Sequence, residues 1–309
     1  MGKRLFVTMA LLLATSAANA QTIAVSTAKL DTYRAILLDA IKASAKAQPG
    51  VTVTVDDAKG DSQTQLAHLR KYAEDKVSAI IVIPSDGDMG PQLTEIAQKA
   101  GIPLIYVNTE PANLADLPDN QVLVASNEKE SGTLETAEVC RLMKGKGKAV
   151  VLMGEPFHSA ARARTQDVDD VLARPECQGI QIVERQAAYW SRDDADQQMR
   201  EWLKAGVAFD AVIANNDEMA LGAIRALKQA GRPMKDVVVA GVDATDDALA
   251  AMVAGDLDVT ILQNAAGQGK AAIDAALKLA KGEKVPRENY VPFELVTPEN
   301  VAKYLPKSQ

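Results

Sequence analysis

The chain has 309 residues, of which 47% are hydrophobic and 24% are charged, a globular balance that excludes a disordered or low-complexity protein. This length corresponds to one large or two medium domains. The formal net charge of −7 argues against a nucleic-acid partner, because phosphate binding requires clusters of Lys and Arg. The two His and two Cys residues show no metal-ligand spacing, so we expect no metal and no other cofactor.

The first twenty residues have the pattern of a secretory signal peptide. Lys3 and Arg4 precede an apolar run, Leu5–Leu13, and Ala18-Asn19-Ala20 supplies a small-residue cleavage site. The apolar run is too short to span a bilayer as a mature helix. We therefore expect cleavage after residue 20 and export of the mature chain.

Export to an oxidising compartment makes a disulfide between the two cysteines possible. Cys140 lies late in an expected helix, and Cys177 lies just before an expected strand. In a strand–helix layout both positions fall at the same end of a sheet, away from the carboxyl ends of the strands. We predict a bond between them, with two buried thiols as the alternative.

In chain order, short β-rich runs alternate with amphipathic segments. The expected strands are Ile23–Ser26, Val51–Val55, Ala79–Ile83, Leu104–Val107, Val122–Ala125, Ala149–Met153, Ile180–Glu184, Ala211–Ala214, Val237–Val242 and Val259–Leu262. The expected helices include Tyr33–Ala47, Gln63–Glu74, Pro91–Ala100, Asp193–Leu203, Glu218–Ala230 and Gly267–Leu279. Several strands are continuously apolar, as are strands buried on both faces of a parallel sheet. Ten strands are many for one compact sheet, so we predict an α/β protein with two doubly wound, Rossmann-like lobes.

Polar side chains follow most of the expected strands. Ligands bind beyond the carboxyl ends of the strands in open α/β sheets, so we expect these side chains to lie close together. Most are planar hydrogen-bonding groups, which can bind neighbouring hydroxyls of a sugar-like ring, and the Tyr and Trp rings can cover its apolar C–H face. The candidate ligand-binding residues are Asp31, Tyr33, Asn108, His158, Arg164, Trp190, Asn216, Asp243 and Gln263.

Several candidates also have a purely structural interpretation. Asn216 and Asp243 could be helix N-caps, and Trp190 could be a core residue. The carboxylates of Asp31 and Asp243 could instead form the acid/base pair of a glycoside-acting enzyme. That enzyme is the alternative function, although neither a nucleophile elbow nor a complete phosphate-binding loop accompanies the pair.

Four short stretches resemble a known family, and the similarity extends over essentially all of the mature chain. These stretches are Ile213–Ala223, Gly241–Ala244, Gly154–Pro156 with His158 following, and Ala163–Thr165. In them the chain resembles the periplasmic sugar-binding proteins of ABC transporters, the ribose and galactose/glucose class. The resemblance implies a binding protein that captures a monosaccharide or cyclitol and is not an enzyme.

The same resemblance implies two lobes that close over one ligand about a hinge of three crossings. We expect residues 21–126 with 264–291 to form the N-terminal lobe, and 127–263 with 292–309 the C-terminal lobe. The implied location is the periplasm, the implied partners are a membrane permease and a chemoreceptor, and the implied state is a monomer. A sugar-responsive repressor shares this core, but it would need a helix-turn-helix where this chain has an export signal.

The resemblance also assigns roles by position. Asp31 and Asn108 would bind hydroxyls from the N-terminal lobe, where Tyr33 would stack on the ring. Trp190 would stack on the opposite face of the ring. The remaining hydroxyl-binding positions are His158, Arg164, Asn216, Asp243 and, at a crossing, Gln263.

The chain departs from this family at two positions that would contact ligand. Ala160 stands where galactose/glucose binders have an Asp, and Thr109 stands where ribose binders have an Arg and glucose binders a Lys. The calcium-binding insertion of the glucose class is absent from residues 128–148. The identity of the ligand therefore stays open. The alternatives are inositol, an amino- or methyl-cyclitol, and a different pentose or hexose.

Overall fold

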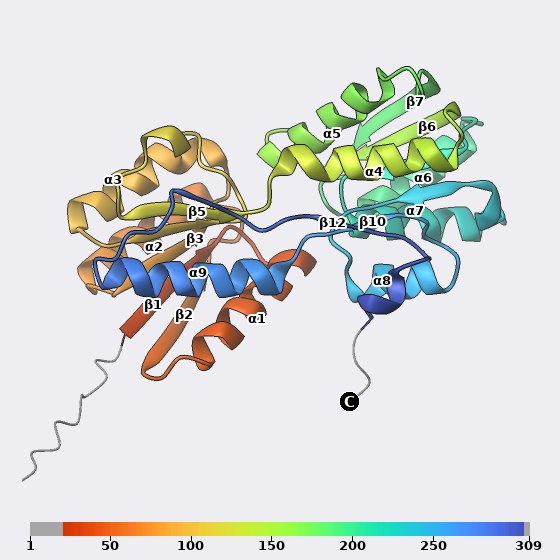
Figure 1. Ribbon diagram of the computed structural model, residues 1–309. Helices are drawn as coiled ribbons and strands as arrows, with labels where there is room; N and C mark the ends of the chain where they lie inside the picture. The colour runs from red at the N-terminus through yellow and green to blue at the C-terminus, as the bar shows by residue number, and fades with distance from the viewer. Residues whose placement is uncertain (1–20, 306–309) are drawn as a thin grey trace, which may run out of the picture.

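The computed structural model describes residues 21–305, and the predicted signal peptide lies outside this range. Its strands are β1 (Gln21–Thr27), β2 (Val51–Asp57), β3 (Ala79–Ile83), β4 (Leu104–Val107), β5 (Gln121–Ala125), β6 (Lys146–Met153), β7 (Gly179–Ala187), β8 (Ala211–Ala214), β9 (Val238–Ala240), β10 (Thr260–Leu262), β11 (Glu288–Tyr290) and β12 (Glu294–Val296). One sheet has the order β11-β5-β4-β3-β1-β2 and a second has the order β7-β6-β8-β9. Every strand pair within these two sheets is parallel, which confirms the predicted fold class (Figure 1).

Helices cover both faces of each sheet. They are α1 (Thr32–Lys46), α2 (Ser62–Glu74), α3 (Gly90–Ala100), α4 (Glu128–Leu142), α5 (Ser159–Leu172), α6 (Arg192–Lys204), α7 (Asp217–Gln229), α8 (Asp246–Val253) and α9 (Ala265–Ala280). In the N-terminal lobe, α1 and α9 pack on one face and α2 and α3 on the other. In the C-terminal lobe, α4 and α5 cover one face and α6, α7 and α8 the other. The result is two three-layered lobes, each with the sheet in the middle.

Burial on both faces explains the apolar runs of the central strands. Ile23 and Val25 point toward α1 and α9, whereas Ala24 between them points toward α2 and α3, and all three are fully buried. The run Ala79–Ile83 is likewise completely buried, in a strand between β1 and β4. Successive side chains of a strand face opposite sides, so a covered sheet requires apolar residues at every position.

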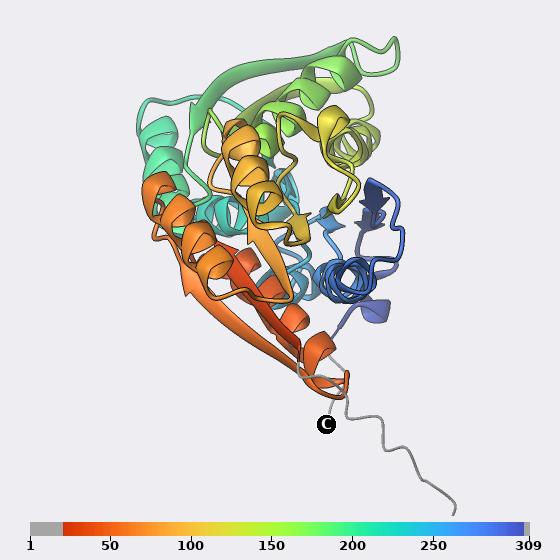
Figure 2. The same cartoon turned by 90° about the vertical axis from the view of Figure 1, so that its left-hand side faces the viewer.

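The chain passes between the lobes three times. The passages lie between β5 and α4, between β10 and α9, and between β11 and β12. Figures 1 and 2 show α9, coloured blue, against the red and orange N-terminal lobe, although the intervening chain forms most of the C-terminal lobe. These passages bring the carboxyl ends of both sheets to one place between the lobes.

Two short strands near the C-terminus were not among the predicted elements. β11 pairs with β5 in parallel, and β12 pairs with β10 in antiparallel orientation. β10 therefore belongs to a separate two-stranded sheet, and only the isolated bridges Ala240–Val259 and Asp243–Leu262 link its segment to the region of β9. Each missed strand has three residues, too few for a periodic pattern, and each is defined by its distant partner.

Cys140, late in α4, and Cys177, two residues before β7, form a disulfide with a Cα–Cα distance of 5.7 Å. The bond joins the end of α4 to the loop that enters β7, at the amino ends of the strands. It therefore lies at the opposite end of the C-terminal sheet from the carboxyl ends of the strands. Within residues 21–305, no helix combines the length and apolarity that a membrane span requires.

Candidate functional site

A cavity of about 300 Å³ lies between the lobes, at the carboxyl ends of the strands. All nine candidate residues line it: Asp31, Tyr33, Asn108, His158, Arg164, Trp190, Asn216, Asp243 and Gln263. The structure thus brings together residues that are up to 232 positions apart, while their part in ligand binding stays a prediction. The lining residues that sequence reasoning did not select are Thr32, Arg34, Glu128, Ala160, Ser191, Arg192, Asp193 and Glu218.

The start of α1 supplies the wall of the N-terminal lobe. Asp31 caps this helix, its Oδ1 accepting a hydrogen bond of 2.8 Å from the backbone N–H of Arg34. The Arg34 guanidinium also forms an ion pair with Asp31, so this carboxylate has its cation within the same helical turn. Tyr33 lies between them in sequence, and burial is the main cause that raises the pKa of its hydroxyl. Tyr33 is therefore a neutral phenol, and its hydroxyl hydrogen is free to be donated.

His158 caps α5 through its ring. Nδ1 accepts a hydrogen bond of 3.2 Å from the backbone N–H of Ala160, which places the ring hydrogen on Nε2. Burial, followed by the positive charges of Arg34 and Arg164, lowers the pKa of His158 to about 3. His158 is thus a neutral imidazole that offers one N–H donor to the cavity.

Trp190 is held in position by a glycine opposite its ring. A Cβ atom at Gly154 would lie 2.1 Å from Cζ2 of Trp190, so only glycine leaves room for the indole there. The His158 ring meets the indole edge-on, with centroids 5.5 Å apart, and the Arg164 guanidinium lies 5.8 Å from the indole centroid. Trp190 packs at the margin of the C-terminal core and lines the cavity, so the two interpretations of this residue are compatible.

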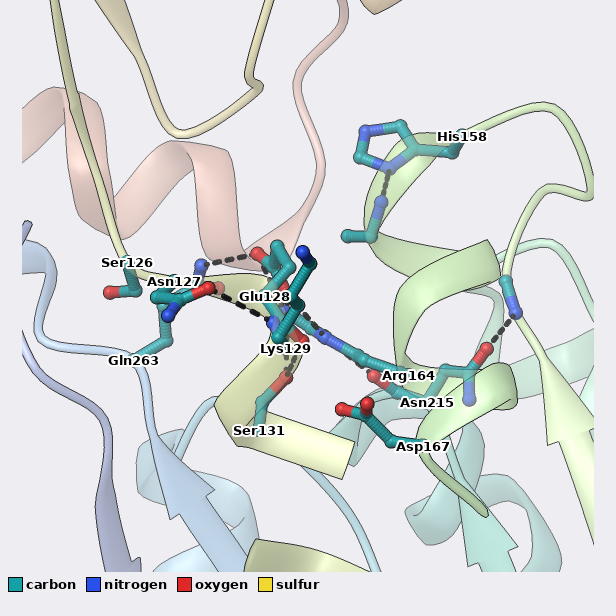
Figure 3. Close-up of polar contacts among 12 residues, drawn as sticks. Ser126, Asn127, Glu128, Lys129, Ser131, His158, Arg164, Asp167, Asn215 and Gln263 are labelled. Carbon is teal, nitrogen blue, oxygen red and sulfur yellow. Dashed lines mark hydrogen bonds and ion pairs between the residues drawn. The ribbon is translucent and has the colours of Figure 1, made fainter. Parts of the chain in front are cut away.

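Arg164 is the centre of a buried polar network, which Figure 3 shows. Its Nε and Nη2 atoms donate to the Glu128 carboxylate at 3.0 and 3.3 Å, and its Nη1 donates to the carbonyl of Asn215 at 2.7 Å. Gln263 reaches the same Glu128 carboxylate at 3.5 Å. Glu128 follows β5 at the first passage between the lobes, so the rule that polar residues after strands meet would have found it.

Asn216 and Asp243 differ in their structural roles. Asn216 caps α7, its Oδ1 accepting from the backbone N–H of Met219 at 3.0 Å, and it lines the cavity as well. Asp243 caps no helix, because Thr245 is the N-cap of α8. Burial raises the pKa of the Asp243 carboxyl, and the Arg164 charge partly opposes this rise. A cap thus explains Asn216 in part, whereas Asp243 has no structural task of that kind.

Three of the candidate residues have a left-handed backbone conformation. The φ angles are 67° at Asn108, 65° at Trp190 and 127° at Asp243. Non-glycine residues adopt such angles at a cost of about 1–3 kcal/mol each, and the surrounding structure must impose them. Strain of this kind concentrates at ligand sites. There it directs a side chain toward the ligand in an orientation that a relaxed backbone does not allow.

Two α/β lobes that enclose one cavity with polar and aromatic groups from both define a two-lobed solute-binding protein. The family model described as a periplasmic binding protein domain matches residues 23–284 of the chain. The chain belongs to the periplasmic binding protein family. Proteins of this family bind solutes without converting them, so the glycoside-acting enzyme is not supported.

Individual relatives match over most of the chain. A protein of Rhizobium meliloti, provisionally named as rhizopine-binding, is 52% identical over 300 residues, which are 97% of each chain. The xylitol-binding protein of Mycolicibacterium smegmatis is 34% identical over 249 residues, 80% of this chain and 68% of the other. An ABC transporter solute-binding protein of Bacillus halodurans, solved with bound myo-inositol, is 37% identical with a TM-score of 0.86 and matches 94% of this chain and 99% of its own.

Proposed function

We propose that this protein binds one monosaccharide or cyclitol in the cavity between its lobes. The observation that carries this proposal is a set of buried polar atoms on cavity-lining residues that have no hydrogen-bond partner within residues 21–305. They are Tyr33 Oη, His158 Nε2 and Trp190 Nε1, together with Nε of Arg34. Buried polar groups normally have partners, so these donors are suited to the oxygens of a bound ligand.

The remaining chemistry of the cavity also suits a polyol. Asp243 and Gln263 offer oxygen acceptors, and a hydroxyl can donate to these while it accepts from the donors above. The cavity volume of about 300 Å³ is at the lower limit for ligand pockets, which favours a single small ring. The relatives named for xylitol and solved with myo-inositol support the same ligand class.

We further propose that the lobes close about the three passages when ligand binds. In this proposal residues 21–126 and 264–291 move against 127–263 and 292–309, because a ligand that contacts both lobes stabilises the closed form. The closed form would deliver the ligand to an ABC transporter permease in the periplasm after removal of a signal peptide, residues 1–20. A chemoreceptor is a further proposed partner, and the proposed state is a monomer.

The ion pair between Lys29 and Glu155 provides a test of closure that leaves the ligand contacts intact. Its atoms are 2.5 Å apart and join the loop after β1 to the loop after β6, so the pair bridges the two lobes. Neither residue lines the cavity. Both side chains are about one-third exposed, so we expect Lys29→Met to raise the apparent Kd only about 2- to 5-fold, mainly through faster dissociation.

Stopped-flow measurement of ligand dissociation checks this expectation. The exchange of Lys29→Glu with Glu155→Lys restores the opposite charges and should return the rate toward that of the unchanged protein. Lys42→Met is the matched control, because Lys42 pairs with Asp39 inside α1 alone. An unchanged rate in Lys29→Met would show that the bridge does not favour the closed form.

The ligand class is tested by thermal shift and by tryptophan fluorescence with myo-inositol, scyllo-inositol, xylitol, D-ribose and D-galactose. A bound ligand raises the melting temperature by mass action. The described chain has two tryptophans, and Trp202 lies in the C-terminal core away from the cavity. In Trp202→Phe we therefore expect ligand to change the emission of Trp190, whereas Trp190→Phe should give a flat titration.

Failure of every polyol to raise the melting temperature, together with a clear shift by an amino acid or a peptide, would contradict the proposed ligand class. A binding polyol that leaves Trp190 emission unchanged would contradict the contact with this indole. Recovery of the bound polyol in altered chemical form would contradict binding without conversion.

A further inference from the structure

Asn215 lies behind the wall that the C-terminal lobe supplies to the cavity. It follows β8 and precedes the cavity-lining Asn216, but it does not itself line the cavity. Its side chain is fully buried. A buried polar side chain needs hydrogen-bond partners inside the protein, and those of Asn215 come from two other segments of this wall.

The first partner lies in the loop after β6. Oδ1 of Asn215 accepts a hydrogen bond of 3.1 Å from the backbone N–H of Gly154. A backbone N–H can only donate, so the amide atom that faces Gly154 is the oxygen. Gly154 packs against the indole of Trp190, and a Cβ atom there would lie 2.1 Å from Cζ2 of that ring. The hydrogen bond therefore fixes the backbone against which the Trp190 ring packs.

The second segment is α5. The hydroxyl of Thr165 donates to the same Oδ1 at 3.2 Å, and Nη1 of Arg164 donates to the backbone carbonyl of Asn215 at 2.7 Å. Figure 3 shows Arg164 beside Asn215. Arg164 lines the cavity, whereas its neighbour Thr165 does not. Both bonds hold α5 against the end of β8, so Asn215 connects two segments that carry cavity walls.

We infer that Asn215 is a positioning residue for ligand binding, which acts without touching the ligand. It orients Trp190 through Gly154, and it orients Arg164 through the two bonds to α5. The inference rests on the proposed function, because it requires that Trp190 and Arg164 contact the ligand. An asparagine with a purely stabilising role would contribute to folding and leave these two side chains in place.

The substitution Asn215→Leu tests this inference. Leucine has a similar size but no acceptor, so the buried N–H of Gly154 loses its partner. We expect the affinity for the polyol that gives the largest thermal shift to fall about 10- to 100-fold, as when a residue that orients binding side chains is replaced. Calorimetry measures this loss. In a Trp202→Phe background without ligand, acrylamide quenching of Trp190 should increase, because the backbone beneath the indole is no longer fixed.

The substitution Asn300→Leu is the matched control. The side chain of Asn300 also makes two hydrogen bonds in the C-terminal lobe, at 2.8 Å to the N–H of Thr297 and at 2.9 Å to the carbonyl of Leu295. It does not line the cavity. We expect Asn300→Leu to lower the melting temperature and to leave ligand affinity and Trp190 quenching unchanged.

A conservative variant should rescue binding. Asn215→Asp keeps the acceptor oxygen and changes only the position of Nδ2, which has no hydrogen-bond partner within residues 21–305. Arg164, which already contacts the Asn215 carbonyl, lies beside the new carboxyl group. The affinity of Asn215→Asp should therefore stay within about 5-fold of that of the unchanged protein.

The substitution Thr165→Val provides a milder test that remains available if Asn215→Leu does not fold. Valine keeps the shape of the side chain and removes only the hydroxyl donor. Affinity should fall about 2- to 5-fold, the effect of one hydrogen bond. Quenching of Trp190 should stay unchanged, because Gly154 keeps its acceptor. An unchanged affinity in Thr165→Val would count against the link through α5.

The outcomes separate the inference from the proposed function. Equal losses of affinity in Asn215→Leu and Asn300→Leu would overturn the inference, because a general loss of stability would then explain both. Binding by Asn215→Asp as weak as by Asn215→Leu would overturn it as well. If no polyol binds the unchanged protein, the proposed function fails. Quenching of Trp190 then decides the inference alone, and an unchanged value in Asn215→Leu would overturn it.

Discussion

Arg164→Met is expected to abolish measurable ligand binding and to lower the free energy of unfolding by about 3–5 kcal/mol. Arg164 is 3% exposed and neutralises Glu128, whose side chain is itself only 16% exposed. Removal of the arginine leaves a buried carboxylate without its cation and the Asn215 carbonyl without its donor. The affinity for ligand should fall by at least about 100-fold. Arg164 lines the cavity, and its hydrogen bonds to Glu128 and to the carbonyl of Asn215 hold both of these residues in place.

Chemical denaturation measures the stability change, and calorimetry with a proven ligand measures the binding change. Arg162→Met is the matched control: it lies on the same helix, α5, but is exposed and does not line the cavity. We expect it to change stability by less than about 0.5 kcal/mol. A double variant, Arg164→Met with Glu128→Gln, should recover part of the lost stability, since no charge is then left buried and unpaired. Comparable losses at both arginines would contradict the role of this network.

Removal of the disulfide is the second large expected effect. Cys140 and Cys177 are separated by 37 positions, and a cross-link that closes a loop of this length stabilises a protein by about 4 kcal/mol in the chain-entropy model. We therefore expect the Cys140→Ser, Cys177→Ser double variant to unfold at a markedly lower urea concentration. Ligand affinity at low temperature should stay unchanged, because neither cysteine lines the cavity.

Denaturation of the unchanged protein with and without a reductant supplies the control, since reduction should reproduce the double variant. The reductant should then have no effect on the variant itself. A loss of affinity that accompanies the loss of stability would show that the C-terminal sheet transmits strain from its amino ends to the cavity. Equal stability of the oxidised and reduced proteins would contradict the stabilising role of the bond.

The candidate site was largely predictable because one rule applies to both lobes. Polar residues in the segments that follow buried parallel strands lie at the same end of the sheet, and all nine candidates line the cavity. Tyr33 and Arg164 lie inside α1 and α5, and Gln263 follows β10, which pairs with β12 in antiparallel orientation. Glu128 was missed because the rule was not applied after β5, although the signal is present there. Arg34 carried a weaker signal: it lies inside α1, and only its pairing with the cap residue Asp31 turns it toward the site.

The backbone geometry of the site was beyond sequence reasoning. The left-handed angle at Trp190 belongs to a bulky residue that does not favour it, so no local propensity predicts it. Asn108 and Asp243 are of types that adopt positive φ more readily, but they do so at only a few of their positions in a chain. The need for glycine at Gly154 arises from the ring of Trp190, which is 36 positions away in sequence. Both features depend on contacts that exist only after the lobe has folded.

The sequence alone determined the fold class, the order of most strands and helices, and the residues that would gather at the strand ends. All three features follow from local patterns. A parallel strand covered on both faces is apolar along its buried length, so polar residues occur after the strand has ended. Only the tertiary structure decided which charge pairs with which. Glu128, Arg164 and Asp243 are far apart in the chain, and Coulomb energies depend on distances and burial that the chain order does not contain. Among residues 21–305, Arg164 pairs with Glu128 and not with Asp243, a choice that no local sequence pattern predicts.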